Sequence, residues 1–312
     1  MSLPARMEKL MMANDEPPRV FLTLLVCTLG RASRLERLLN SLAAQTSKNF
    51  EVIIVDQNPV GFLDPTIHKF PELRISHLRS RPGLSRGRNI GLSASSGRYI
   101  GFPHDDVWLE RTTIEEVIDT FRRNPKLSAI TGQFVDPEGQ PLTSNLPGEA
   151  QITRENIFEA GNSGTVFIER AVAQVLKFDE AIGPGAPTDF QSGEETDFLL
   201  RALESNVAGW YFPKLTIFHD AIDTSAPLVE RTRRATAHAR GFGYLMRKHR
   251  YPLPYILGKV SRMTMRGAWC VATGDLEGAR LKFAWANGVL YGYSKGKPKP
   301  SLAAERARAK IK

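Results

Sequence analysis

The sequence predicts an α/β protein built on a doubly wound, mostly parallel sheet, with a smaller sheet beside it and a helical region at the C-terminus. In residues 19–126, short apolar runs alternate with amphipathic helical patterns, as in sheets whose parallel strands are joined by helices. Residues 127–226 change to short strands and loops rich in Gly and Pro. In residues 227–294, long stretches of helical periodicity return.

Four strands, each followed by a helix, are expected in the first part of the chain. The strands are expected at 20–27, 50–56, 73–78 and 98–102. The helices are expected at 33–45, near Pro65, at 85–95 and at 112–123. The first helix is the best defined, since it repeats leucine at helical spacing: Leu35, Leu38, Leu39 and Leu42. Ligands of such sheets bind at the carboxyl ends of the strands, so the residues that follow these strands are candidate site residues.

The rest of the chain is expected to hold three strands, with a helix at 194–204 before the last of them, and then three helices. The strands are expected at 129–135, 165–168 and 207–212, and the helices at 229–249, 254–272 and 276–291. Between them, segment 178–192 is rich in Gly and Pro, which predicts a shaped loop near a site. We expect residues 1–18 to be a flexible leader and residues 295–312 to be a basic tail without regular structure.

The length and composition are those of an ordinary globular protein. With 312 residues, of which 42% are hydrophobic and 24% charged, the chain can bury a full core as one large or two smaller units. Cys27 and Cys270 lie far apart in apolar stretches, so neither a disulfide framework nor a thiolate metal site is expected. Neither a signal peptide nor a long apolar run is found. The sequence therefore predicts a cytoplasmic protein, and a peripheral position on the inner face of a membrane stays open.

Positive charge is concentrated in the C-terminal part of the chain. The net charge is +9, and much of the excess lies after Glu230 and in the tail. An anionic membrane surface or a nucleotide substrate would match it, whereas nucleic acid is not expected because no base-reading motif is found. Aromatic and basic residues alternate in 240–251 and 281–291, as in helices that dock on membranes. Helix packing, oligomerisation or a solvated basic face would use the same arrangement.

An acidic segment, 102–108, is the first strong signal for a site. Asp105 and Asp106 follow the strand expected at 98–102. A carboxylate pair just past a strand end can hold a metal ion that also binds phosphate.

A second acidic segment, 193–198, begins a helix. Glu195 shares a face of this helix with apolar residues at spacings of three, four and seven: Phe198, Leu199 and Ala202. Glu195 is therefore expected to point inward, as a general base would. The alternative is that Glu194 and Glu195 only complement the helix dipole. Asp197 is expected to pair with Arg201 on the outer side of the helix.

A glycine-rich turn, Gly83–Gly91, runs into a helix and carries three polar side chains: Arg86, Arg88 and Asn89. Backbone amides, a helix N-terminus and guanidinium groups all favour a diphosphate ligand. The alternative is a role in surface solubility, which suits Arg86 better than Arg88. The segment after the first strand, Thr28-Leu-Gly-Arg31, lacks the glycine triplet that a dinucleotide-dependent dehydrogenase needs.

The order of these segments resembles the family 2 glycosyltransferases of the GT-A fold, which move a sugar from a nucleoside diphosphate to an acceptor hydroxyl. The resemblance runs from Phe21 to about Asp220. It rests on segments in the same order: 26–31, 38–46, 50–56, 83–91, the Asp105-Asp106 pair, 178–180 and 193–197. It implies that residues 19–126 form a nucleotide-sugar-binding subdomain and residues 127–226 an acceptor and catalytic-base subdomain.

The resemblance implies how the donor would be bound. Asp56, at the end of the second strand, would hydrogen-bond the nucleobase, and Thr28 and Arg31 would line the same pocket. A strand-end cap is the alternative for Asp56. Arg88 and Asn89 would lie beside the nucleotide and its diphosphate.

The resemblance also implies a divalent metal ion, Mn or Mg. Asp106 would contact the metal, and Asp105 would support it or bind the ribose. His104 stands where the family usually has an aspartate, and an imidazole can donate a hydrogen bond where a carboxylate would accept one. His219 aligns with a histidine that follows the catalytic helix in related enzymes and would be a second ligand, which favours Mn. A structural histidine is the alternative.

Glu195 occupies the position of the family's usual catalytic aspartate, and Glu194 that of its glutamate. We therefore expect a metal-dependent, inverting glycosyltransferase with a nucleoside-diphosphate sugar donor and a glycan or lipid-linked acceptor, in surface-polysaccharide or glycolipid assembly. Since His104 and Glu195 depart from the family pattern, a nucleotide-sugar-binding protein without turnover is one alternative. The positive charge motivates a second alternative, a basic nucleic-acid-binding protein, for which no base-reading motif is found. The hypothesis requires Asp106 and Glu195 to line a common cleft.

Overall fold

The structure is a computed structural model that describes residues 20–142, 146–221 and 225–297. The chain divides into two compact units. Among the described residues, the first unit contains 20–179 and 194–221, and the second contains 180–193 and 225–297. The leader expected at 1–18 lies outside the described residues, as does nearly all of the basic tail.

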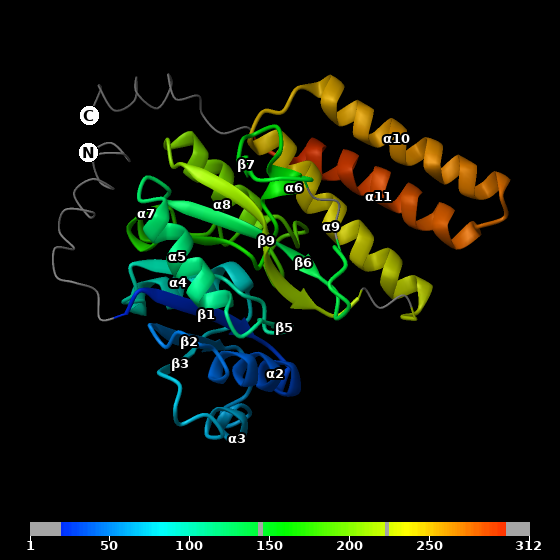
Figure 1. The fold of residues 1–312 in the computed structure, drawn as a ribbon. Helices are drawn as coiled ribbons and strands as arrows, with labels where there is room; N and C mark the ends of the chain where they lie inside the picture. The colour runs from blue at the N-terminus through cyan, green and yellow to red at the C-terminus, as the bar shows by residue number, and fades with distance from the viewer. Residues whose placement is uncertain (1–19, 143–145, 222–224, 298–312) are drawn as a thin grey trace, which may run out of the picture. The chain divides into compact units, whose positions relative to one another are not determined.

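One nine-stranded sheet forms the centre of the first unit (Figure 1). Its strands follow the order β3-β2-β1-β4-β8-β6-β9-β5, and β7 pairs with β9. Their bounds are β1 (Leu22–Thr28), β2 (Phe50–Asp56), β3 (Ile75–Arg79), β4 (Tyr99–Gly101), β5 (Val107–Trp108), β6 (Ala129–Val135), β7 (Ala150–Gln151), β8 (Phe167–Glu169) and β9 (Gly209–His219). Strands β1 to β4 are parallel, because β1 pairs with β2 and β4, and β2 pairs with β3. The predicted fold class is confirmed.

The strands expected to form a smaller sheet extend this same sheet. β8 runs antiparallel to both β4 and β6, β9 runs parallel to β6, and β5 and β7 run antiparallel to β9. β9 continues well past the expected end at residue 212. The β6–β9 ladder skips from Tyr211 to Thr216, so Pro213 falls in the irregular stretch and breaks no ladder hydrogen bond. This continuation carries His219 to the end of the strand.

Helices connect the strands of the first unit. Their bounds are α2 (Ala32–Ala43), α3 (Asp64–Ile67), α4 (Leu84–Ala94), α5 (Thr113–Arg123), α6 (Ile157–Ala160), α7 (Arg170–Leu176) and α8 (Glu194–Glu204). Thr112 occupies the N-cap position of α5, but its hydroxyl donates to the Glu116 carboxylate at 2.7 Å and caps no backbone amide. The segments α6, α7, β5 and β7 are too short to leave a periodic signal in the sequence.

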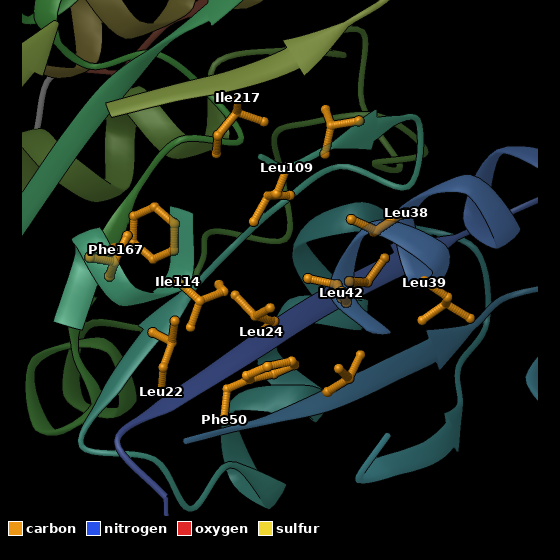
Figure 2. Close-up of a cluster of buried hydrophobic side chains, with 14 of the residues drawn as sticks. Leu22, Leu24, Leu38, Leu39, Leu42, Phe50, Leu109, Ile114, Phe167 and Ile217 are labelled. Carbon is orange, nitrogen blue, oxygen red and sulfur yellow. The ribbon is translucent and has the colours of Figure 1, made fainter. Parts of the chain in front are cut away.

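The core of the first unit fixes the orientation of α2. The four leucines of this helix are fully buried in a cluster with side chains of β1 and β2, and Figure 2 shows Leu38, Leu39 and Leu42 with Leu24 and Phe50 in that cluster. Burial of each leucine contributes about 1.5–3 kcal/mol. Because the leucine face is held against the sheet, the opposite face of α2 is free to present its polar side chains to a site.

The second unit consists of three long helices and the loop 180–193. The helices are α9 (Leu228–Lys248), α10 (Leu253–Ala272) and α11 (Leu276–Lys295). α9 and α11 pack closely, since a Cβ at Gly243 would lie 2.0 Å from the Val289 carbonyl oxygen and one at Gly292 would lie 2.0 Å from that of Arg240. Across residues 20–142, 146–221 and 225–297, none of the helices combines the length and the apolar character needed to cross a bilayer.

The glycine- and proline-rich loop packs on the helices of the second unit. Tyr291 donates to the Asp189 carboxylate at 2.7 Å, and the Phe190 ring stacks on Tyr244 with centroids 4.1 Å apart. The Ser192 hydroxyl donates to the His238 carbonyl oxygen at 2.9 Å. The loop therefore has a defined conformation set by α9 and α11.

Candidate active site

The first acidic pair lies between β4 and β5, in contact with arginines of α2. Both carboxylates are buried. Arg31 Nη1 lies 3.0 Å from Asp105 Oδ1 and 2.7 Å from Asp106 Oδ2, and Arg34 Nη1 lies 3.4 Å from the same Asp106 oxygen. Arg31 was expected to line a nucleobase pocket with Thr28, and here its guanidinium is bound to the acidic pair instead.

Arg31, Arg34 and Arg37 form what we call the arginine face of α2. They are spaced three residues apart: Arg31 is the N-cap residue of α2, and Arg34 and Arg37 lie within the helix, away from the buried leucines. Arg37 donates to the backbone oxygen of Asp106 at 3.1 Å and pairs with both oxygens of Asp220 at 2.8 and 2.7 Å. The sequence analysis missed Arg34 and Arg37, although their spacing after the first strand was a readable signal. Together with the acidic pair they form a dense cluster of charge at the carboxyl ends of β1 and β4.

Asp106 and His219 are the two side chains that fit a metal ion. His219 Nε2 lies 3.5 Å from Asp106 Oδ1, and that buried oxygen has no hydrogen-bond partner among the described residues. Burial alone would raise the pKa of Asp106, but His219, His104 and Arg31 hold it well below its usual range. Asp106 is therefore fully ionised at neutral pH, as a metal ligand must be.

A metal ion at this point would need further ligands from a substrate. In the described parts of the chain, no three His, Cys, Asp or Glu side chains gather closely enough to enclose a metal ion. Mg²⁺ is commonly held by one or two carboxylates together with substrate phosphates, and an imidazole ligand is better suited to Mn²⁺. The residues present thus fit a shared metal site and do not fit a closed structural one.

The second acidic pair is buried against Arg88. Arg88 Nη1 lies 3.3 Å from Glu194 Oε1, and Arg88 Nη2 donates to Glu195 Oε1. The guanidinium is only 2% exposed and sits over the rings of Phe178 and Phe102, 5.0 and 5.7 Å from their centroids. Arg88 was expected at the diphosphate, and in this structure both of its terminal nitrogens are used by carboxylates.

Two buried carboxyl groups share the single positive charge of Arg88, and their pKa values move in opposite directions. Burial and the neighbouring Glu195 charge raise the pKa of Glu194 well above its usual range. Burial would raise the pKa of Glu195 too, but Arg88 and hydrogen bonding from His104 lower it well below that range. Of the two acids, Glu195 is therefore the one that ionises more readily, and an ionised carboxylate is the state that a general base requires.

A short hydrogen-bonded chain joins Glu195 to the first acidic segment. Ser163 donates its hydroxyl proton to Glu195 Oε1 at 2.8 Å, and His104 Nε2 lies 2.9 Å from Ser163 Oγ. Because the Ser163 proton is used, His104 must donate from Nε2. His104 Nε2 is also 3.6 Å from Glu195 Oε1. His104 thus links Glu195 to the segment that holds Asp106, and Ser163 is a site residue that the sequence analysis missed.

Asp197 is buried, not on the outer side of α8 as expected. Its carboxylate is bound by Arg201 Nε at 2.8 Å, so the expected ion pair is present. Arg201 also donates to the backbone oxygens of Leu176 and Lys177 at 2.6 and 2.7 Å. The pair therefore fastens α8 to the end of α7.

Asp56 lies at the end of β2 with no exposed surface. Its Oδ1 accepts from the backbone and side-chain nitrogens of Asn58, both at 2.8 Å, and its Oδ2 lies 3.0 Å from His77 Nε2 and 3.0 Å from Arg79 Nη1. A carboxylate offers about four acceptor sites, so a nucleobase would have to replace one of these donors. Burial would raise the pKa of Asp56, but the hydrogen bonds from Asn58 and His77 and the Arg79 charge lower it.

Replacing Asp56 by asparagine is expected to lower the free energy of unfolding in a pH-dependent way. A carboxylate with a lowered folded pKa stabilises the fold above its unfolded pKa of about 3.9 and loses that contribution as pH falls through the folded value. Urea unfolding should therefore show that the free energy of unfolding of D56N falls furthest below that of wild type near pH 7, and that the difference is smaller near pH 3. A deficit that is equal at both pH values would contradict the ionised state of Asp56.

Three further residues were expected to bind the nucleotide-sugar donor, and each has a different environment in the structure. The Asn89 side chain is held by the backbone of Phe178, with its amide donating to the carbonyl oxygen at 3.0 Å and its oxygen accepting from the amide at 2.7 Å. Asn89 thus joins α4 to the start of the acceptor-side loop. Arg86 is half-buried and reaches the Pro82 carbonyl oxygen at 3.4 Å. The Thr28 hydroxyl is buried and has no hydrogen-bond partner among the described residues.

Comparison with known proteins finds a family match over part of the chain. Residues 23–172 match the family model described as glycosyl transferase family 2. These residues form a glycosyl transferase family 2 domain. An uncharacterized glycosyltransferase of Haemophilus influenzae is 30% identical to the chain over 189 residues, which are 59% of this chain and 62% of that protein. The chain thus covers less than two thirds of this relative's length.

Two solved structures share the fold of this chain. TarS of S. aureus, residues 1–349, in complex with UDP-GlcNAc has 16% sequence identity and a TM-score of 0.52, with 86% of this chain and 92% of that one covered. The mannosyltransferase PcManGT of Pyrobaculum calidifontis, in complex with GDP-Man and Mn²⁺, has 15% sequence identity and a TM-score of 0.55, with 99% and 91% covered. These similarities confirm the expected GT-A type of fold.

The family 2 match covers only part of the site. It includes the arginine face of α2, Asp56, Arg88 and the acidic pair at Asp105 and Asp106. Helix α8 and strand β9 lie beyond residue 172, so the assignments of Glu195 and His219 depend on geometry alone. Their contacts with Arg88, His104 and Asp106 bring them to the matched domain.

Proposed function

We propose that this protein is a metal-dependent, inverting glycosyltransferase that moves a sugar from a nucleoside-diphosphate donor to an acceptor hydroxyl. One observation carries the proposal: His104 and Ser163 connect the ionised Glu195 to the segment that holds the buried, ionised Asp106. A base and a metal ligand in one connected cluster suit a displacement in which a proton leaves the acceptor and charge develops on a diphosphate.

The donor would be bound through the first acidic pair and the arginine face of α2. Asp106 and His219 would hold the divalent metal, Mn or Mg, which when bound would neutralise charge on the departing diphosphate. Arg31 and Arg34 are the cations that now balance Asp105 and Asp106. A metal and a diphosphate together would let these arginines turn to the phosphate oxygens. The donors named in the two structural neighbours, UDP-GlcNAc and GDP-Man, support a nucleotide sugar as the donor class.

Glu195 is proposed as the base. It takes the proton of the acceptor hydroxyl as the acceptor oxygen bonds to the anomeric carbon, and the bond to the diphosphate oxygen breaks with its electron pair on that oxygen. Ser163 and His104 orient the Glu195 carboxylate, and the raised pKa of Glu194 together with the lowered pKa of Glu195 favours a negative charge on Glu195. A glycan or lipid-linked acceptor, in surface-polysaccharide or glycolipid assembly, completes the proposal at the level of the family.

A second candidate function is nucleotide-sugar binding without turnover. It is favoured by the partners of Glu195, since Arg88, Ser163 and His104 all contact the same carboxylate oxygen and would weaken it as a base.

The two candidate functions can be distinguished by whether nucleoside diphosphate is released. UDP, GDP and dTDP sugars are first tested for a rise in melting temperature with and without Mn²⁺. The sugar that stabilises the protein is then incubated with it. Formation of free nucleoside diphosphate supports the transferase, and stabilisation without any release supports the binding protein.

Replacing Asp106 by asparagine is expected to abolish the gain in UDP affinity that Mn²⁺ provides. The amide keeps the size of the carboxylate but loses the charge that attracts a divalent cation. Calorimetric titration of UDP with and without Mn²⁺ measures the effect, with D119N as the control, because Asp119 is an acid of α5 that pairs only with neighbouring arginines among the contacts recorded for it. Equal Mn²⁺ enhancement in D106N and wild type would remove Asp106 as a ligand.

A further inference from the structure

Several large apolar side chains near the turn between α10 and α11 are exposed. Met265, Trp269 and Val271 of α10 are 66%, 71% and 51% exposed, and Leu276, at the start of α11, is 68% exposed. We call these four residues the hairpin-end patch. Large apolar side chains gathered at one end of a helix pair mark an interaction surface more often than single exposed residues do.

The patch belongs to a helix with little packing of its own. Of the 20 residues of α10, only Ile256, Gly267 and Cys270 are buried. Gly267 faces α11, since a Cβ there would lie 2.8 Å from the Phe283 ring. Met265 and Trp269 are four residues apart and therefore share a different face, which the described part of the chain leaves uncovered. Exposed apolar surface of this kind favours a partner that covers it.

The charges around the patch are positive. Arg262 and Arg266 lie on α10 and Arg280 on α11, each within a few residues of the patch. The two nearby acids are engaged elsewhere: Asp275 caps α11 through the Gly278 amide at 2.8 Å, and Glu277 pairs with Arg231 at 3.1 Å. The partner therefore has to offer an apolar layer bordered by negative charge.

A lipid surface fits both requirements, and a second copy of the chain fits only one. Two copies joined through this patch would bring Arg262, Arg266 and Arg280 of each toward those of the other. An anionic bilayer instead attracts basic side chains at its surface, and Trp is enriched at the boundary between headgroups and acyl chains. We propose that the end of the α10–α11 hairpin docks on the anionic face of a lipid bilayer, with Trp269 and Leu276 entering the headgroup region.

This inference deepens the proposed function and rests on it in one respect, because a lipid-linked acceptor would be presented at such a surface. Docking itself needs neither donor nor acceptor. It can therefore be measured apart from transfer, and E195Q should bind vesicles as wild type does. Loss of transfer and loss of vesicle binding are then separate results.

The test is cosedimentation of the full chain with vesicles of phosphatidylcholine alone or mixed with phosphatidylglycerol. We expect binding to the mixed vesicles, weak binding to the neutral ones, and a loss of at least tenfold in the partition coefficient for the double variant W269E/L276E. V60E is the matched control, because Val60 is an 87% exposed apolar residue of the first unit. Unchanged circular dichroism and melting temperature would show that the double variant is folded.

Two further measurements separate the lipid surface from its rivals. R262E/R266E should reduce binding to anionic vesicles and leave the weak binding to neutral ones unchanged. Sedimentation velocity over a range of concentrations reports on a second copy. Undiminished vesicle binding by W269E/L276E overturns the proposal, and so does a dimer of wild type that the same substitutions dissociate.

Discussion

Replacing Glu195 by glutamine is expected to lower kcat by about 100- to 10,000-fold, the range that a positioned general base contributes. The affinity for donor should stay within about twofold, because Glu195 contacts Ser163, His104 and Arg88 rather than the arginine face of α2. An amide keeps the shape of the carboxylate and its capacity to accept from Ser163, but it cannot take up a proton. Single-turnover transfer with the donor at saturation, together with calorimetric titration of UDP, measures both quantities.

E195Q is also expected to fold. In wild type, burial and the Glu195 charge raise the pKa of Glu194, while Glu195 is the carboxylate that balances Arg88. When the charge at Glu195 is removed, Glu194 can lose its proton and become the counter-ion of Arg88. E204Q, at the exposed end of the same helix, is the matched control and should leave kcat unchanged. Turnover by E195Q within tenfold of wild type would show that another group accepts the proton.

The parts of the fold with a strong local signal could be predicted from the sequence. The leucines of α2 repeat at helical spacing, and the helix formed within two residues of its expected bounds. The two acidic segments could also be found, since each follows or begins a regular element. Contacts between distant segments could not be predicted from the sequence. Arg88 meets Glu194 and Glu195 across 106 and 107 residues, and such a contact depends on the order of strands in the sheet.

Helix α8 shows why the direction of Asp197 was misjudged. A rule based on one apolar face assumes that the opposite face is solvated. In α8 the buried residues include Glu194, Glu195, Asp197, Phe198, Leu199, Leu200 and Ala202, so the helix is enclosed on nearly every side. Its acids are stabilised by partners from α4 and from α8 itself, and only the assembled structure reveals them. Ser163 could not be predicted as a site residue for the same reason, because a single serine in a loop gives no periodic or motif signal in the sequence.

Replacing Arg88 by methionine is expected to lower the free energy of unfolding by about 3–5 kcal/mol, the usual cost of removing one partner from a buried ion pair. Methionine fills a similar volume between Phe102 and Phe178, so the loss comes mainly from two buried carboxyl groups left without a cation. Urea unfolding of R88M and wild type gives the difference. R86M, a change of the same kind on a half-buried arginine two residues away, is the control and should cost less than about 1 kcal/mol.

The pH dependence of R88M distinguishes lost charge from lost packing. In wild type the lowered pKa of Glu195 stabilises the fold above its unfolded pKa, and that contribution is lost as pH falls through the folded value. In R88M both carboxyls would have raised pKa values, so the folded variant would bind more protons than its unfolded chain and would gain stability as pH falls. The plots of unfolding free energy against pH for wild type and R88M should therefore approach each other as pH falls from 8 to 5. The double variant R88M/E194Q, with one buried acid fewer, should recover part of the loss at pH 8. A deficit that is constant with pH, and no recovery in the double variant, would mean that Arg88 acts through packing and does not hold Glu195 in its ionised state.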